Sequence, residues 1–211
     1  MIDVTTQSGT DFRITPAEEI RLDDGALLWR WRRPAALPED LALTIQHNLP
    51  WEQPEIRLFG RWHRIPRLQC WCADRGVVYR YSGRTLPARD WSAELALLRR
   101  LTSEITGQPF NSVLANLYRD GDDAMGWHAD DEKELGPAPW IASWSFGASR
   151  EFSLRRKGRT RTEARITLQH GELLLMSPAI QQRWQHALPR RKSVQQPRLN
   201  LTFRQILANP I

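Results

Sequence analysis

The second half of the chain is a series of short segments with the composition of β-strands. Helical patterns come only before Phe110, and Gly, Pro, Asp or basic residues separate the later runs. Helices followed by many short strands indicate an α+β domain built around a β-sandwich or a jelly-roll barrel. A doubly wound fold would instead alternate strands with helices. The expected strands are Ser112–Arg119, Trp140–Gly147, Arg150–Arg155, Arg165–Gln169, Glu172–Met176, Arg183–Leu188 and Leu199–Ile206.

Two helices are predicted in the first half. Residues Pro38–Asn48 carry acidic residues in the first turn, which suits a helix. A second helix is expected between Pro87 and Gly107, with Asp90 near its N-terminal end, because apolar residues recur there at steps of three and four. Residues 1–36 are expected to be loosely structured apart from one short apolar run. The apolar positions of the second helix are Trp91, Leu95, Leu98, Leu101 and Ile105.

A chain of 211 residues is long enough for one domain with a sizeable core. No apolar run approaches the roughly 20 residues that span a bilayer, and the first residues lack the basic-then-apolar order of a signal peptide. We therefore expect a cytoplasmic protein that has no membrane association and acts as a monomer. Cys70 and Cys72 are interpreted as reduced thiols rather than as a disulfide or a metal site.

The net charge of +6 comes from a composition rich in arginine, since only three of the 30 basic residues are lysine. Arginine binds phosphate through a planar pair of donors, so this bias suits an anionic polymer such as a nucleic acid. A GC-rich genome would produce the same bias without any such partner. Composition alone leaves both explanations open.

His128, Asp130 and His186 are the candidate metal ligands. An extended backbone points the side chains of His128 and Asp130 to the same face, and His186 follows on a later strand. Two imidazoles and one carboxylate can hold iron(II) and leave three positions open for a co-substrate and O2. The H-x-D pattern alone also occurs by chance. The remaining histidines, His47, His63 and His170, are interpreted as helix-end, loop or turn residues.

The segment Arg198–Arg204 has a polar face and an apolar face. Period two places Arg198, Asn200, Thr202 and Arg204 on one side, and such a strand normally exposes its polar side to solvent. Because Arg198 and Arg204 follow the third candidate ligand, His186, so closely, they suggest clamps for a dicarboxylate instead. A zinc hydrolase would not need such a pair. Asn116 and Tyr118 repeat the two-residue spacing of polar groups on an earlier strand.

Taken together, these motifs resemble the AlkB-type Fe(II)/2-oxoglutarate dioxygenases, closest to the branch that repairs double-stranded DNA. The resemblance covers roughly residues 55 to 206 and implies a double-stranded β-helix. We expect one domain with three segments: an N-terminal extension and helix at 1–50, which the resemblance matches poorly, a nucleotide-recognition segment and supporting helix at 51–110, and the double-stranded β-helix catalytic core at 111–211. The matching motifs are Asn116-Leu-Tyr118-Arg-Asp-Gly121, His128-Ala-Asp130-Asp-Glu132, Ile141–Gly147, His186 and Arg198-Leu-Asn200-Leu-Thr-Phe-Arg204.

The resemblance assigns roles to these residues. His128, Asp130 and His186 would be the catalytic iron ligands. The 2-oxoglutarate contacts would come from both polar strands, with Arg198 on the distal carboxylate. These contacts are Asn116, Tyr118, Arg198, Asn200 and Arg204.

The resemblance also implies a site for a base flipped out of the helix. Phe59, next to a glycine and several arginines, would wedge into the duplex, although such a residue is usually part of a core. The basic run 155–161 would contact phosphates, although charge runs are usually solvated loops. Tyr79 and Tyr81 would contact the base, and ordinary cross-strand packing is the alternative role for both. The expected substrate contacts are Phe59, Arg67, Tyr79, Tyr81, Ser82 and Glu132.

The implied reaction uses Fe(II), 2-oxoglutarate and O2. An Fe(IV)-oxo intermediate would hydroxylate the N-methyl group of 1-methyladenine or 3-methylcytosine in DNA, and formaldehyde would leave. The DNA would be duplex or single-stranded. Two alternatives stay open at this point: the same chemistry on RNA, protein or a small molecule, and a non-catalytic nucleic-acid-binding protein with a lapsed iron site. The arginine-rich segments argue against the small molecule.

Overall fold

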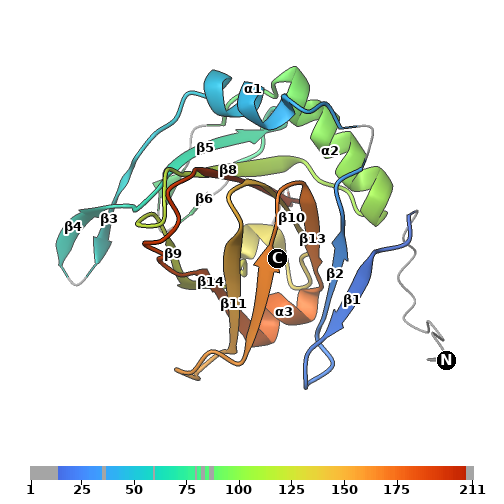
Figure 1. The fold of residues 1–211 in the computed structure, drawn as a ribbon, viewed down its shortest axis with the longest axis vertical. Helices are drawn as coiled ribbons and strands as arrows, with labels where there is room; N and C mark the ends of the chain where they lie inside the picture. The colour runs from blue at the N-terminus through green and yellow to red at the C-terminus, as the bar shows by residue number, and fades with distance from the viewer. Residues whose placement is uncertain are drawn as a thin grey trace.

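The computed structural model describes residues 14–34, 37–58, 60–78, 80–81, 84–85 and 88–207. Two antiparallel sheets form its body (Figure 1). The larger has seven strands in the order β1-β2-β13-β10-β15-β8-β5, and the smaller has four in the order β12-β11-β14-β9. The strands of the larger sheet are β1 (Glu18–Arg21), β2 (Leu27–Trp31), β5 (Leu68–Ala73), β8 (Ser112–Tyr118), β10 (Ile141–Gly147), β13 (Glu172–Met176) and β15 (Arg198–Arg204). Those of the smaller sheet are β9 (Met125–His128), β11 (Arg150–Arg156), β12 (Ala164–Leu168) and β14 (Trp184–Leu188).

Two short hairpins complete the β-structure. Strands β3 (Glu55–Leu58) and β4 (Arg61–Arg64) pair with each other and project away from the two sheets (Figure 1). Strands β6 (Arg80–Tyr81) and β7 (Arg84–Thr85) form the second hairpin. Both lie in the segment that the sequence assigns to nucleotide recognition.

Helices α1 (Leu41–Asn48) and α2 (Ala93–Thr106) cover the outer face of the larger sheet (Figure 1). Ser92, rather than Asp90, caps α2, because its side chain accepts a hydrogen bond from the Leu95 amide. Gly107 ends the helix in the left-handed conformation, as its position in the sequence predicts. The predicted helix at Pro38–Asn48 exists but begins only at Leu41.

The alternation of side chains along the strands divides the interior into two apolar clusters. On β15, Leu199, Leu201 and Phe203 join the cluster beneath the helices, together with Leu95 and Leu98 of α2. The second cluster joins the two sheets. It includes Leu114, Phe152, Leu154, Leu174, Met176 and Trp184. The polar side of β15 is therefore buried between the sheets and not exposed to solvent.

The jelly-roll prediction is confirmed, and each of the seven predicted strands is present to within about two residues. The expectation of a loosely structured region at 1–36 is wrong for Glu18–Arg21, which forms β1 and pairs with β2. The short apolar run that was excepted from it, Leu27–Trp31, is strand β2, which pairs with β13. The division at residues 50 and 110 stays a prediction, although strands from all three segments share the larger sheet. No helix was predicted at α3 (Pro178–Arg183) or at the short 3-10 helix η1 (Lys133–Leu135), and the expected strands do not include β1, β3 to β7 or β9.

Cys70 and Cys72 are free thiols buried on one face of β5, as expected. Among the described ranges, no helix has both the length and the apolar character needed to cross a membrane.

Candidate functional site

A pocket opens between the two sheets. Its walls come from β8, β10, β13 and β15 on one side and from β9, β11 and β14 on the other, so the site depends on the complete sandwich. Its polar lining residues come from β8, β10 and β15 and from the segments that carry His128, Asp130 and His186, and the rest of the lining is apolar. It consists of Leu114, Asn116, Tyr118, Met125, His128, Asp130, Ser143, Phe152, Met176, His186, Ala187, Leu188, Arg198, Asn200, Thr202 and Arg204.

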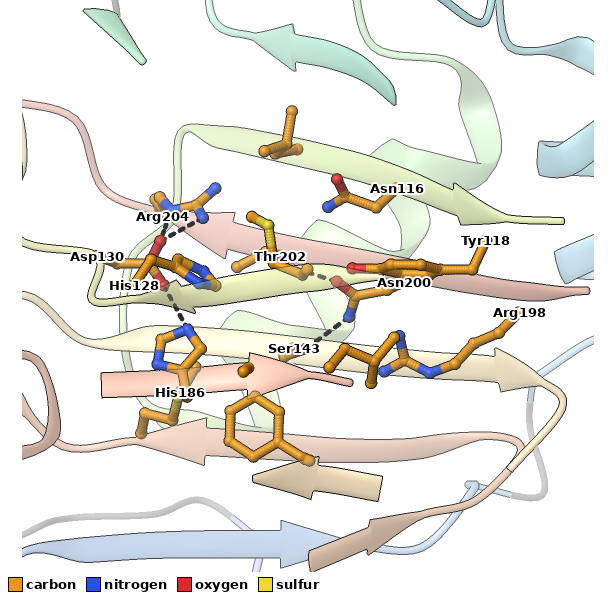
Figure 2. A pocket seen from close by; sticks show the side chains of 16 residues that line it. Asn116, Tyr118, His128, Asp130, Ser143, His186, Arg198, Asn200, Thr202 and Arg204 are labelled. Carbon is orange, nitrogen blue, oxygen red and sulfur yellow. Dashed lines mark hydrogen bonds and ion pairs between the residues drawn. The ribbon is translucent and has the colours of Figure 1, made fainter. Parts of the chain in front are cut away.

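The three predicted metal ligands meet at one end of this pocket. His128 ends β9 and pairs directly with His186 on the adjacent strand β14, while Asp130 lies two residues beyond β9. One ligand atom of each residue lies within 4.8 Å of those of the other two. Figure 2 shows the side chains of His128, Asp130 and His186 close together, from the end of β9, the loop after it and β14. The cluster is the two-histidine, one-carboxylate set that suits iron(II).

The two imidazoles are neutral at pH 7. Nδ1 of His128 lies 2.8 Å from the Gly126 carbonyl, which can only accept, so Nδ1 carries the proton and Nε2 keeps its lone pair. Burial lowers the pKa of His128, and burial with the neighbouring His128 lowers the pKa of His186 to about 3. Both rings therefore present the form that a metal requires.

The carboxylate of Asp130 is ionised, and only one of its two oxygens accepts hydrogen bonds from the described residues. Oδ1 accepts from Nη2 and Nε of Arg204 at 2.5 and 3.2 Å. Burial would raise the pKa of Asp130, but the positive charge of Arg204, which also donates to Oδ1, outweighs it and lowers the pKa to about 2. Oδ2 is buried without a hydrogen-bond partner, 3.7 Å from Nε2 of His186. An unpaired carboxylate oxygen beside two imidazole lone pairs fits a bound cation.

The polar face of β15 runs from this cluster to the other end of the pocket (Figure 2). Asn200 lies in the middle and donates to Ser143 Oγ at 2.7 Å, while Thr202 donates to Asn200 Oδ1 at 3.1 Å. At the far end, Arg198 Nη2 donates to Ser145 Oγ at 2.8 Å. The arginines therefore sit at opposite ends of one buried face, so a dicarboxylate between them would meet different groups at its two ends.

Arg198 is a buried cation that forms no ion pair with a carboxylate in the part of the chain that the structure describes. Its guanidinium lies 5.4 Å from the centroid of the Tyr118 ring, and its Nε has no hydrogen-bond partner. Burial lowers the pKa of Arg198 to about 10, so the side chain is still charged at pH 7. A buried, charged group with a spare donor is suited to an anionic ligand.

Asn116 and Tyr118 line the pocket from β8, next to β15. Arg67, expected on the substrate side, is 3% exposed and donates from Nε to Asn116 Oδ1 at 2.8 Å. Arg67 therefore contacts the side chain expected to bind the dicarboxylate. Its predicted contact with a base stays a prediction.

The remaining expected substrate contacts are only partly described. Phe59, Tyr79 and Ser82 lie outside the described residues, and Tyr81 is described only as part of the β6 backbone. Glu132 is half-buried, two residues after Asp130 and directly before η1. On β4, Trp62 is 62% exposed, and its neighbours Arg61, His63 and Arg64 are exposed as well.

The basic run 155–161 lies at the turn between β11 and β12. Its first residue, Arg155, packs its guanidinium 4.2 Å from the centroid of Trp127, directly before the ligand His128. Lys157 donates to Asp131 at 2.6 Å, beside Asp130. The run is therefore anchored next to the metal cluster, and Arg159 and Arg161 remain exposed.

Arg150 joins the two loops beside Tyr118 and was not predicted as a site residue. It is 2% exposed, and its guanidinium lies 5.9 Å from the Tyr118 centroid. It donates to the main-chain carbonyls of Asp120, Asp123 and Pro189 at 3.1, 2.9 and 2.8 Å. One side chain thus donates hydrogen bonds to three carbonyls and holds the two loops together.

Ser143 and Ser145 were also missed as individual contacts, although the motif containing them was recognised. They lie two residues apart on β10, opposite Thr202 and Asn200 of β15. Period two, applied to Ile141–Gly147 as it was to Arg198–Arg204, would have placed both hydroxyls on the pocket face.

The comparisons with known proteins agree with this geometry. Residues 28–204 match the family model described as the 2OG-Fe(II) oxygenase superfamily. The chain is 47% identical over 160 residues to mouse (Mus musculus) "DNA oxidative demethylase ALKBH2", covering 72% of this chain and 67% of the relative. Its human (Homo sapiens) counterpart is 46% identical, with 72% and 61% covered. Human "Alpha-ketoglutarate-dependent dioxygenase alkB homolog 3" is 39% identical, with 77% and 59% covered.

Solved structures share the fold at low sequence identity. The structure of OsALKBH1 superposes with a TM-score of 0.54 at 17% identity and covers 89% of this chain and all of that one. A Burkholderia pseudomallei oxidoreductase of the 2OG-Fe(II) oxygenase family gives a TM-score of 0.54 at 16% identity, with 87% and 89% covered. On the extent of the family match and the identity to these relatives, the chain belongs to the 2OG-Fe(II) oxygenase superfamily.

Proposed function

We propose that the chain is an oxidative demethylase that removes N-alkyl groups from DNA bases. The observation that carries the proposal is the pairing, within one pocket, of a metal-ligand cluster and a buried, charged arginine. Two relatives that are 46–47% identical are named DNA oxidative demethylases, which supports DNA as the substrate. The chain covers 67% and 61% of the lengths of these relatives, so their activity is a proposal for this chain.

His128, Asp130 and His186 would hold iron(II), which together with O2 and 2-oxoglutarate supplies the oxidant for an unactivated N-alkyl carbon. The protein's own contribution is to fix the ligands. The Gly126 carbonyl orients the His128 ring and fixes its tautomer, and Arg204 immobilises one oxygen of Asp130.

Arg198 would bind the distal carboxylate of 2-oxoglutarate. Ser145 holds one of its terminal nitrogens, which leaves the rest of the planar donor set for the ligand. Asn116, Tyr118, Asn200 and Arg204 would complete the contacts along the same face. The apolar residues of the pocket, such as Phe152 and Leu188, would exclude water from the reacting groups.

The flipped base would enter from the side of Glu132 and the two hairpins. The exposed cationic side chains of β4 and of the run 155–161 suit contacts with phosphates on either side of such a base. Phe59, which lies between β3 and β4 in the sequence, would fill the gap left in the duplex. Arg67, Tyr79, Tyr81, Ser82 and Glu132 remain the proposed base-side residues.

We infer 1-methyladenine and 3-methylcytosine as substrates. Hydroxylation of the N-methyl carbon gives a hemiaminal, which loses formaldehyde and restores the base. One 2-oxoglutarate and one O2 would be consumed for each base repaired, with succinate and CO2 as the coproducts. A cytoplasmic location and a monomeric state are part of the same proposal.

The proposal is tested by formaldehyde release from a 3-methylcytosine oligonucleotide with iron(II) and 2-oxoglutarate supplied. The oligonucleotide is presented single-stranded, as a duplex and as RNA, and the His128→Ala variant serves as the inactive control. Turnover of either DNA form supports a DNA demethylase, and turnover of RNA alone points to the RNA enzyme. If wild-type protein releases nothing from any of the three, the demethylase proposal is wrong.

A further inference from the structure

Gln181 is a fully buried polar side chain close to the metal cluster that none of the roles above uses. It is 0% exposed and lies in α3, the short helix that leads directly into β14. Polar side chains are rarely buried to this extent unless their hydrogen bonds are satisfied. Its partners therefore indicate why a glutamine stands at this position.

The main-chain N–H of Asp130 donates to Oε1 of Gln181 at 3.0 Å. Because a backbone N–H can only donate, it fixes the orientation of the amide and turns Nε2 toward Met176. Nε2 then donates to the Met176 sulfur at 3.6 Å. Gln181 thus joins the backbone of one proposed ligand to a side chain in the pocket wall.

Asp130 lies outside any strand, so no sheet partner holds its backbone. Strand β9 ends at His128, and the chain bends at Asp130. Arg204 holds one oxygen of the carboxylate, while Gln181 holds the main chain of the same residue. Together they leave little freedom for Oδ2, the oxygen that has no hydrogen-bond partner.

The connection also links two ligands that are far apart in the sequence. Gln181 precedes His186 by one short turn and the start of β14, so a single segment supplies His186 and the acceptor for Asp130. Movement of α3 would displace both residues together. The hydrogen bond between Asp130 and Gln181 therefore connects the loop after β9 to the segment before β14 beside the metal cluster.

We infer that Gln181 is a positioning residue for the metal centre, which acts by holding the main chain of Asp130 through its amide oxygen. The inference rests on the proposed metal ligands and goes beyond them, because Gln181 is not itself a ligand. Groups that orient metal ligands typically contribute about 10–100-fold to metal affinity or activity. Loss of the acceptor should therefore weaken metal binding without removing any ligand.

The test is a titration of the metal-free chain with Mn(II), followed by the electron paramagnetic resonance signal of the free ion. Gln181→Met removes the acceptor at a similar side-chain length, and Gln181→Asn keeps the amide but shortens its reach. Gln181→Glu retains an acceptor oxygen at the original length. Gln182→Met is the matched control, because Gln182 lies next in the same helix and donates to the Pro137 carbonyl, away from the metal ligands.

We expect Gln181→Met and Gln181→Asn to weaken Mn(II) binding about 10–100-fold, and Gln181→Glu and Gln182→Met to stay near the wild type. Wild-type affinity in a folded Gln181→Met or Gln181→Asn variant would overturn the inference. So would an equal loss in Gln182→Met. If Gln181→Met does not fold, the Mn(II) affinities of Gln181→Asn and Gln181→Glu are compared instead. Equal Mn(II) affinities of these two variants would overturn the inference. Failure of the wild type itself to bind Mn(II) would refute the proposed metal centre instead.

Discussion

Arg204 binds only one of the two carboxylate oxygens of Asp130. Its guanidinium holds Oδ1 through Nη2 and Nε, while Oδ2 faces His186 without a hydrogen-bond partner. The side chains are 4% and 1% exposed, so this is a buried ion pair. The second arginine of β15 therefore binds a proposed metal ligand directly, whereas Arg198 forms no ion pair with a carboxylate among the described residues.

Replacing Arg204 with methionine should destabilise the metal-free chain. An uncompensated buried carboxylate remains, and breaking one partner of a buried pair costs about 3–5 kcal/mol. Urea denaturation at pH 7 measures the loss of unfolding free energy. The double variant Asp130→Asn with Arg204→Met should recover part of it, because neither charge remains. Equal stability of the wild type and Arg204→Met would contradict the buried ion pair.

The metal-free chain should lose stability as the pH falls below about 6.5. The folded-state pKa of His186 is lowered to about 3, so between these values the unfolded chain binds a proton that the folded chain does not. This difference costs roughly 1.4 kcal/mol per pH unit. Asp130 adds to this loss only below about pH 3.8, the usual pKa of an aspartate, because its folded-state pKa is lowered to about 2.

The control for the pH effect is His186→Gln. Its denaturation midpoints, measured from pH 7 to pH 4.5, should depend less steeply on pH than those of the wild type. Identical slopes for the two proteins would rule out a neutral, buried imidazole at this position.

Arg198→Met should raise the KM for 2-oxoglutarate about 10–100-fold, because charged hydrogen bonds contribute about 1.5–3 kcal/mol. Ser145→Ala should have a smaller effect, since it removes only the group that holds Nη2. The KM for the oligonucleotide should change little in either variant. Steady-state decarboxylation assays that vary one substrate at a time give both values, and a selective change in the oligonucleotide KM would refute the assignment.

Gly121→Ala should lower the melting temperature, because the added Cβ would lie 1.8 Å from the Arg191 carbonyl oxygen. Gly121 also exchanges main-chain hydrogen bonds with Arg191 and Val194, so the loops on both sides of Tyr118 would separate. Gly126→Ala is the matched control, since nothing lies within 4 Å of its added Cβ. Differential scanning fluorimetry should find the first variant clearly less stable than the second, and equal values would contradict the close approach of the loops.

Many strands of the second half were predictable because turn residues separate short runs of strand-forming residues, some of which alternate between polar and apolar side chains. The segment Arg198–Arg204 alternates polar and apolar residues, and both faces prove to be buried, one beneath α2 and one in the pocket. By contrast, β1 is mostly exposed and β2 reads Leu-Leu-Trp-Arg-Trp, without alternation. Their place in the larger sheet follows from the pairing of β2 with β13 and of β1 with β2, which no local pattern reveals.

The ligands of the site were predictable, but their supports were less so. His128, Asp130 and His186 are residue types that bind metals, and their spacing suits neighbouring strands. Gln181 and Arg150 gain their roles only from main-chain groups that the fold brings to them. Phe152, which stacks on His186, cannot be distinguished from a core residue in the sequence.

Iron(II) and 2-oxoglutarate must bind side by side in this pocket for any oxidation to follow. Anaerobic addition of 2-oxoglutarate to the iron-loaded chain should therefore produce a metal-to-ligand charge-transfer absorption band at one equivalent of each. His186→Ala should abolish the band, and Arg198→Met should require more 2-oxoglutarate to reach it. Absence of the band in the wild type under saturating conditions would contradict the shared pocket and would favour a nucleic-acid-binding protein without an oxidative centre.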